Sequence, residues 1–149
     1  MKIPFGRLGI AIALLGVWGC DNRGANMPMA GEARHPNGLV VPRPAALTAG
    51  EDGERLVFSD TRDTRQPLIV EFALTSEKPP RSATALDSGE AFFRIEEGGS
   101  YSGGTEYRLE AWRMDAGRWI FMTAEQQKEG TATAFEIPWA MLRNARIER

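Results

Sequence analysis

The sequence predicts a mostly β domain, an antiparallel sandwich or open barrel with a short C-terminal helix. Short apolar and β-branched runs alternate with turns rich in Gly and Pro, at the spacing typical of such folds. One run alternates with period two over eight residues, and two later runs flank a short Gly-containing loop. A chain of 149 residues that is 42% hydrophobic is long enough for one domain with its own core.

The first strands are expected at residues 39–41 (LVV) and 55–59 (RLVFS), with Pro and Gly breaks between them. The next run, PLIVEFALTS, has a large apolar side chain at every second position and places Glu71 and Thr75 in the other phase, which is typical of a strand with one buried face. Its predicted core-facing residues are Leu68, Val70, Phe72 and Leu74. A long loop at 77–90 then leads to a strand at 91–97 (AFFRIEE).

The clearest hairpin joins residues 105–114 to residues 118–126 through a three-residue loop, Asp115–Gly117. Pairing Met114 with Arg118 would set Arg113 opposite Trp119, where a cation–π contact would contribute ~0.5–1 kcal/mol if exposed. Large apolar groups near the turn fall on both faces, so we expect this end to be covered on two sides or to form a contact surface.

The chain is expected to end with a strand at 131–137 (TATAFEI) and a short helix. Pro138 suits the first turn of a helix, where its missing N–H is not needed. Trp139, Leu142 and Ala145 would share the face that closes one end of the sheet.

The N-terminus has the features of an export signal. Lys2 and Arg7 form a basic segment, and residues 8–19 (LGIAIALLGVWG) form an apolar run that is too short to span a bilayer. Residues 1–19 are therefore predicted to be a signal peptide. Without them, 16 basic and 20 acidic residues remain, a net charge of −4.

The only cysteine, Cys20, follows this apolar run in the sequence VWGC. This segment resembles the lipobox of bacterial lipoproteins, in which a small residue precedes the cysteine that is lipidated and becomes the mature N-terminus. The resemblance implies a diacylglyceryl thioether and an N-acyl chain on Cys20, enough for stable membrane anchoring. It also implies a lipid-anchored protein of the cell envelope that faces the periplasm. In the enteric sorting pattern Asp21 resembles an inner-membrane retention signal, and the choice of membrane stays open.

Residues 20–36 read as the lipidated N-terminus and a flexible tether, because the stretch lacks apolar periodicity and is broken by Pro and Gly. A single β-rich domain is expected over residues 37–149. The only histidine, His35, lies in this tether and is assigned no role. Asp60 and Asp63 in DTRDTR are read as part of a solvated turn, because neighbouring arginines neutralise them.

No catalytic or cofactor-binding motif is apparent, so the sequence predicts neither an enzyme nor a cofactor. The acidic balance without a basic stripe argues against nucleic acid as a partner. A protein partner is expected instead. The segment EEGGSYSGGTEY combines acids, small residues and one aromatic in a Gly-rich loop, the composition of a binding loop.

The acidic or polar runs at 51–54 and 125–130 are expected to be turns that gather with this loop at one end of the fold. Such a surface would be acidic and rich in amides, and would suit a basic partner. The predicted partner-binding residues are Glu96, Glu97, Ser100, Tyr101, Glu125, Gln126 and Gln127.

Two functions fit a small exported domain of this kind. By class, the chain resembles immunity lipoproteins against type VI secretion cell-wall hydrolases, which implies that loops occlude the active site of a periplasm-acting toxin, with Ca²⁺ taking part only within the complex. The alternative is an accessory or assembly lipoprotein of an envelope secretion or pilus complex. Its contact surface would be the apolar region around Trp112, Trp119 and Ile120.

Overall fold

Strands dominate the computed structural model, which describes residues 28–60, 67–86, 89–101, 104–128 and 135–149. The elements of these ranges are β1 (Met29–Arg34), β2 (Leu39–Pro44), β3 (Thr48–Asp52), β4 (Arg55–Ser59), β5 (Ile69–Thr75), β6 (Thr84–Leu86), β7 (Ala91–Tyr101), β8 (Gly104–Asp115), β9 (Arg118–Lys128), α1 (Glu136–Asn144) and β10 (Arg146–Ile147).

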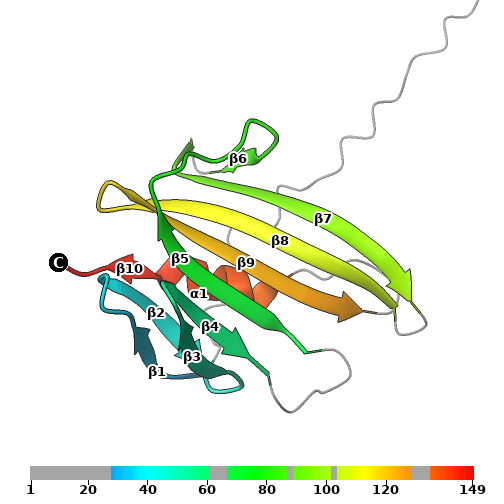
Figure 1. Cartoon of the computed structure of the whole chain (residues 1–149), viewed down its shortest axis with the longest axis horizontal. Helices are drawn as coiled ribbons and strands as arrows, with labels where there is room; N and C mark the ends of the chain where they lie inside the picture. The colour runs from blue at the N-terminus through cyan, green and yellow to red at the C-terminus, as the bar shows by residue number, and fades with distance from the viewer. Residues whose placement is uncertain (1–27, 61–66, 87–88, 102–103, 129–134) are drawn as a thin grey trace, which may run out of the picture.

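The strands form two antiparallel sheets (Figure 1). The small sheet has the order β1-β2-β10, and the large sheet has the order β3-β4-β5-β9-β8-β7-β6. In the described part of the chain neither sheet closes into a barrel. The predicted mostly β, antiparallel fold with a short C-terminal helix is confirmed.

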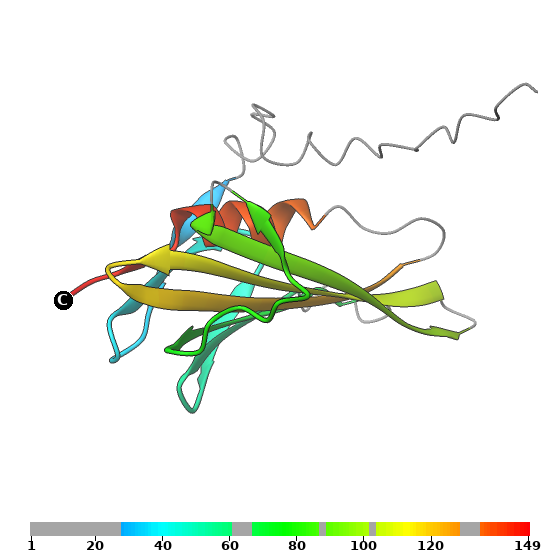
Figure 2. The same cartoon turned by 90° about the horizontal axis from the view of Figure 1, so that it is seen from above.

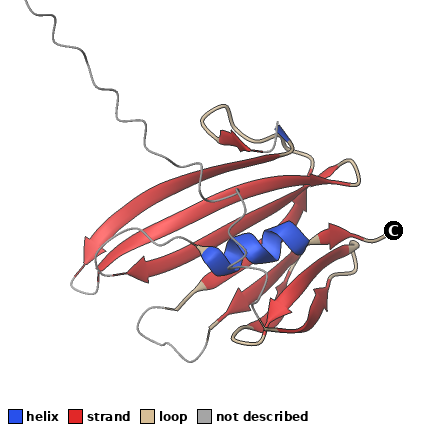
Figure 3. Cartoon of the chain, turned by 180° about the vertical axis from the view of Figure 1, so that it is seen from behind, coloured by secondary structure: helices blue, strands red, loops and turns tan. Residues whose placement is uncertain are grey.

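Helix α1 lies against one face of the large sheet (Figures 2 and 3). The ring of Trp139 on α1 meets that of Phe93 on β7 edge to face, with centroids 5.8 Å apart. The predicted inward set of β5 is confirmed, because Leu68, Val70 and Phe72 all belong to the buried core cluster. We call the opposite face of the large sheet the outer face. Because strand side chains alternate, it carries every second residue of each strand.

The β8–β9 hairpin forms as predicted, but its register differs by one residue. Asp115 pairs with Arg118, so the loop is only Ala116 and Gly117. Both have positive φ, 46° and 76°, as the two-residue turn favoured by right-handed strand twist requires. The shift places Arg113 opposite Ile120 and leaves the predicted pairing with Trp119 wrong.

Arg113 instead holds the C-terminal end of α1. Its guanidinium donates hydrogen bonds to the carbonyls of Leu142 and Ala145. Both carbonyls lie at the end of the helix, where the regular intrahelical hydrogen bonds stop, and the Leu142 carbonyl also accepts a hydrogen bond from the backbone N–H of Ala145 at 3.3 Å. Burial lowers the pKa of Arg113, and the nearby Asp115 carboxylate opposes that shift. Asp115 also accepts a hydrogen bond from the backbone N–H of Ile147 at 2.7 Å, which fixes the start of the C-terminal segment.

Strand β1 lies within the range expected to be a flexible tether. It pairs with β2, and β10 pairs with the other edge of β2, so the two terminal segments of the described chain lie on either side of one strand (Figure 3). Ion pairs join them. Arg146 contacts Glu32 at 2.6 Å and Glu148 at 2.7 Å, and Arg34 also contacts both carboxylates. These guanidinium groups lower the pKa of Glu32 and Glu148.

His35 also belongs to the folded part, which corrects its assignment to a tether without a role. Its Nδ1 accepts a hydrogen bond from the N–H of Asn37 at 3.2 Å, and its Nε2 lies 3.0 Å from the carbonyl oxygen of Gly53. With Nδ1 accepting, Nε2 is the ring nitrogen that donates. His35 therefore connects the β1–β2 turn to the β3–β4 turn.

Three other expectations differ from the structure. Residues 84–86 of the expected long loop form edge strand β6. The expected Gly-rich loop at 98–104 is largely strand, because β7 continues to Tyr101 and β8 starts at Gly104. Of the expected last strand at 131–137, residues 136 and 137 belong to α1, and residues 131–134 lie outside the described residues.

Candidate partner-binding surface

The predicted binding residues lie at one end of strands β7, β8 and β9. We call this the distal end; it comprises residues 96–101, 104–108 and 125–128. Arg108 on β8 pairs with Glu96 on one side and Glu125 on the other. Tyr107 pairs likewise with Glu97 and Gln126.

The backbones of the other three predicted residues lie at the same end. Ser100 pairs with Thr105, Tyr101 with Gly104, and Gln127 with Glu106. The structure thus brings the two sequence runs together on neighbouring strands. That these residues bind a partner stays a prediction.

The predicted residues divide between the two faces of the sheet. Glu96 and Glu125 share the outer face with Arg108, whereas Glu97 and Gln126 share the helix side with Tyr107. A partner that contacts both sets must therefore grip the end of the sheet rather than lie flat on one face.

A chain of ion pairs crosses the outer face at the distal end. Arg94 lies 3.4 Å from Glu96 and 2.6 Å from Glu110, and Arg108 lies 3.5 Å from Glu110 and 3.3 Å from Glu125. Glu110 is only 8% exposed, and its hydrogen bond to Arg94 raises the pKa of that arginine. The two arginines hold all three carboxylates of this network in place. Because the network has one more carboxylate than guanidinium groups, its net charge is negative.

Sequence reasoning missed Arg94, Arg108 and Glu110 as members of this surface. A signal was present, because β7 carries Arg94 and Glu96 two residues apart and β8 repeats the spacing with Arg108 and Glu110. In adjacent antiparallel strands this spacing sets opposite charges across from each other. The predicted register of the β8–β9 hairpin is wrong by one residue, so it does not place Arg108 opposite Glu125.

The acidic run at 51–54 does not join the distal end, so the expected gathering of three turns is wrong. Arg55, which follows this run, pairs with Ala73, and Ala73 pairs with Phe121. That row lies toward the β8–β9 turn, at the opposite end of the sheet from Glu125. The run at 125–128 is also not a turn, because it belongs to β9.

The apolar surface expected for an assembly role is largely buried. Ile120 faces the core with no exposed area, and Trp112 is 7% exposed. On the outer face Trp112 stacks on Phe121 with ring centroids 5.0 Å apart, and Phe92 meets Trp119 edge to face at 5.7 Å. The β5–β6 connection leads from the interior of the large sheet to its edge strand β6 (Figure 1).

The described ranges hold neither a candidate metal centre nor a candidate membrane span. No group of three or more His, Cys, Asp or Glu side chains is placed there to hold a metal ion. No helix of the described residues is long and apolar enough to cross a membrane. Cys20 and Asp63 lie outside these ranges, so the lipidation of Cys20 stays a prediction.

Solved structures share the fold at low sequence identity. A chain from Bacteroides thetaiotaomicron aligns over 81% of this chain with a TM-score of 0.57 at 13% identity, and this chain spans 50% of its length. The Ran-binding protein Mog1p of Saccharomyces cerevisiae aligns over 81% of this chain and 96% of its own, with a TM-score of 0.54 at 10% identity. At such identities the likeness concerns the fold alone.

Sequence comparison is more specific. The protein named Immune protein Tsi3 of Pseudomonas aeruginosa is 36% identical over 116 residues, which cover 76% of this chain and 80% of that protein. Residues 40–146 match the type six secretion immunity 3 domain. The predicted class of immunity protein is thereby confirmed, and the chain belongs to the type six secretion immunity 3 family.

Proposed function

We propose that this protein binds a toxin delivered by type VI secretion and blocks its active site with the distal end of the large sheet. The match of residues 40–146 to an immunity domain family is the observation that carries this proposal. The arrangement of the distal end supports it, because residues from two separate sequence runs meet there on three adjacent strands. The chain acts by binding, and the chemistry that it blocks belongs to the toxin.

The distal end is rigid and carries exposed carboxylates, two properties that suit insertion into an active-site cleft. Its strands are joined by main-chain hydrogen bonds and by the ion pairs of the outer face, so little conformational entropy is lost on binding. The side chain of Glu96 is 53% exposed, and Glu97 is also exposed. Exposed carboxylates at the rim steer a basic partner and raise its association rate. In this proposal Tyr101, at the end of β7, enters the cleft.

The protein works at the periplasmic side of a membrane in this proposal, anchored by lipid on Cys20. Strand β1 begins at Met29, so eight residues, 21–28, separate the lipidated cysteine from the folded domain. Eight residues span at most about 28 Å even when fully extended. The domain is therefore held close to the membrane that it protects, and the toxin that it meets is a periplasm-acting cell-wall hydrolase.

The proposal is tested with charge reversals at the two ends of the sheet. In the first assay, recipient cells express the full chain or one of its variants and are challenged with a neighbouring strain that secretes the toxin. In the second assay, the same chains serve as bait to capture the toxin, which mass spectrometry identifies. Glu97→Lys should abolish capture and protection. Glu54→Lys, the same change at the opposite end, should leave both intact. Equal protection by the two variants would remove the distal end from the interface.

A further inference from the structure

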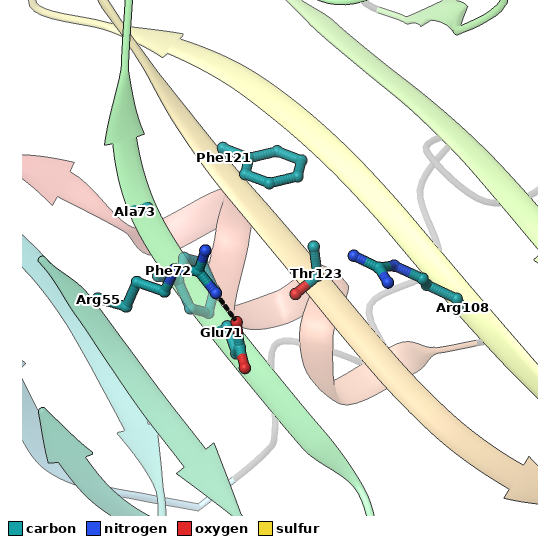
Figure 4. Close-up of a pocket in the computed structure, with 7 residues that line it drawn as sticks. All are labelled: Arg55, Glu71, Phe72, Ala73, Arg108, Phe121 and Thr123. Atoms are coloured by element: carbon teal, nitrogen blue, oxygen red, sulfur yellow. Dashed lines mark hydrogen bonds and ion pairs between the residues drawn. The ribbon is translucent and has the colours of Figure 1, made fainter. Parts of the chain in front are cut away.

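A pocket opens on the outer face between strands β4, β5, β8 and β9. Its volume is about 100 Å³, which is room for the head of one side chain or a small organic molecule. Figure 4 shows the residues that line it. They are Arg55, Glu71, Phe72, Ala73, Arg108, Phe121 and Thr123.

Thr123 presents a polar group to this pocket that lacks a partner in the described part of the chain. The residue is 8% exposed, yet no hydrogen bond joins its Oγ1 to another described group. Figure 4 shows this oxygen directed into the pocket from β9. A buried hydroxyl without a partner costs free energy, and an incoming acceptor would recover it.

Arg108 lines the same pocket with hydrogen-bonding capacity to spare. Its guanidinium lies 3.3 Å from Glu125 and 3.5 Å from Glu110, longer than the 2.7–2.9 Å typical of charge-assisted hydrogen bonds. A guanidinium has five N–H donors in a planar fork that matches a carboxylate. Figure 4 shows this fork directed toward Thr123 from β8.

The rest of the lining offers an ion pair and an apolar surface that suits a short methylene stem. Glu71 is the only acid among the seven lining residues, and Arg55 holds it at 2.8 Å. Two guanidinium groups and one carboxylate line the pocket, and the carboxylates of Glu110 and Glu125, which are not part of the lining, lie 3.5 Å and 3.3 Å from Arg108. The ring of Phe121 and the methyl group of Ala73 supply apolar surface beside these charges.

We propose that this pocket binds a carboxylate group, which accepts hydrogen bonds from Thr123 Oγ1 and the Arg108 guanidinium while its methylene stem rests on Phe121. The site lies on the outer face and shares Arg108 with the distal end, but it does not depend on the toxin-binding role. The carboxylate comes from a free small organic acid or from an acidic side chain of a bound protein. The chemistry is the same in both cases.

The test titrates the full 149-residue chain, labelled with ¹³C at alanine methyl groups and held in detergent micelles, with three probes. Propionate represents a free acid, acetyl-glutamate methylamide represents an acidic side chain, and propionamide is the neutral isostere of propionate. The methyl signal of Ala73 reports occupancy. We expect a saturable shift with both carboxylates and none with propionamide. Tighter binding of propionate identifies a free acid as the source, and tighter binding of the capped glutamate identifies a protein side chain.

Two variants test the assigned contacts. Thr123→Val keeps the shape of the side chain and removes the hydroxyl, and Arg108→Gln removes the charge while Arg94 continues to hold Glu110 at 2.6 Å. Each should weaken carboxylate binding by about tenfold, the effect of losing one charge-assisted hydrogen bond. Thr48→Val, the same change at an exposed position on β3, should leave the affinity unchanged. An equal response to propionamide, or affinities that neither variant lowers, would overturn the proposal.

Discussion

Gly38 is the position where the structure predicts the sharpest effect of one added methyl group. Its φ of 95° lies in the region that L side chains rarely adopt. A Cβ at this position would lie well inside van der Waals contact of the carbonyl oxygen of Glu148. That contact is with main chain, so no side-chain rotation relieves it. Gly38→Ala therefore combines backbone strain with a steric clash.

The two contributions are separated by a matched glycine. Gly89 has a φ of 92°, and no heavy atom lies within 4 Å of the place that an added methyl group would occupy, so Gly89→Ala carries the backbone strain alone. We expect it to lower the free energy of unfolding by about 1–3 kcal/mol. In Gly38→Ala the Glu148 backbone must also move by on the order of 1 Å. That movement breaks the hydrogen bond from the Glu148 N–H to the Gly38 carbonyl and loosens the pairing of β10 with β2, a further loss of about 2 kcal/mol.

Thermal unfolding followed by circular dichroism measures the difference. For a folded part of this size 1 kcal/mol corresponds to roughly 4 °C in Tm, so Gly38→Ala should melt about 8 °C below Gly89→Ala. Both variants should melt below the parent chain. Equal Tm losses in the two variants would show that the C-terminal segment does not press against Gly38, and the clash argument would fail.

Three further predictions concern contacts that hold the domain together or anchor it. Arg113→Met removes a donor from two carbonyls at the end of α1, of which the Leu142 carbonyl keeps the Ala145 N–H, and should cost about 1–3 kcal/mol in urea unfolding, whereas Arg118→Met at the exposed turn should cost under about 0.5 kcal/mol. Because the pKa values of Glu32 and Glu148 are lowered in the folded chain, their contribution to stability is complete above their unfolded pKa and is lost as the pH falls through the folded one. The urea midpoint should therefore drop more steeply below pH 4.5 for the parent chain than for Glu32→Gln; parallel curves would contradict this. Cys20→Ser should move the protein from the membrane fraction to the soluble fraction, or leave it as an unprocessed precursor. If mass spectrometry shows that the parent chain carries no lipid on Cys20, the proposed anchor is refuted.

The elements that sequence predicts best are those whose pattern records burial. In β5 the large apolar side chains of Val70 and Phe72 stand two residues apart with Glu71 between them, and this spacing marks the buried face directly. Pro138 and the apolar spacing of Trp139 and Leu142 do the same for α1, and all three are buried. Strand β1 shows the opposite case. Five of its six residues are exposed, so it has no apolar periodicity that a sequence pattern could reveal.

The binding surface could be predicted only in part. The acidic and amide character of 96–97 and 125–127 is visible in composition, but their neighbours depend on strand register. A loop of two residues rather than three shifts every pair of the β8–β9 hairpin by one, because side chains alternate with period two. That shift sets Arg108 opposite Glu125 instead of Ala124 and creates the ion-pair chain.

The sequence by itself determined the fold class, the inward face of β5, the existence of the hairpin and the position of the helix. These follow from local patterns of burial and turn chemistry, which a single segment carries. The tertiary structure alone decided which segments meet: β1 beside β2, Glu32 with Arg146, and the outer-face pocket formed by four strands. The physical reason is that pairing between distant segments depends on main-chain hydrogen bonds and charge contacts, and these are available to many partners until the packed core selects one.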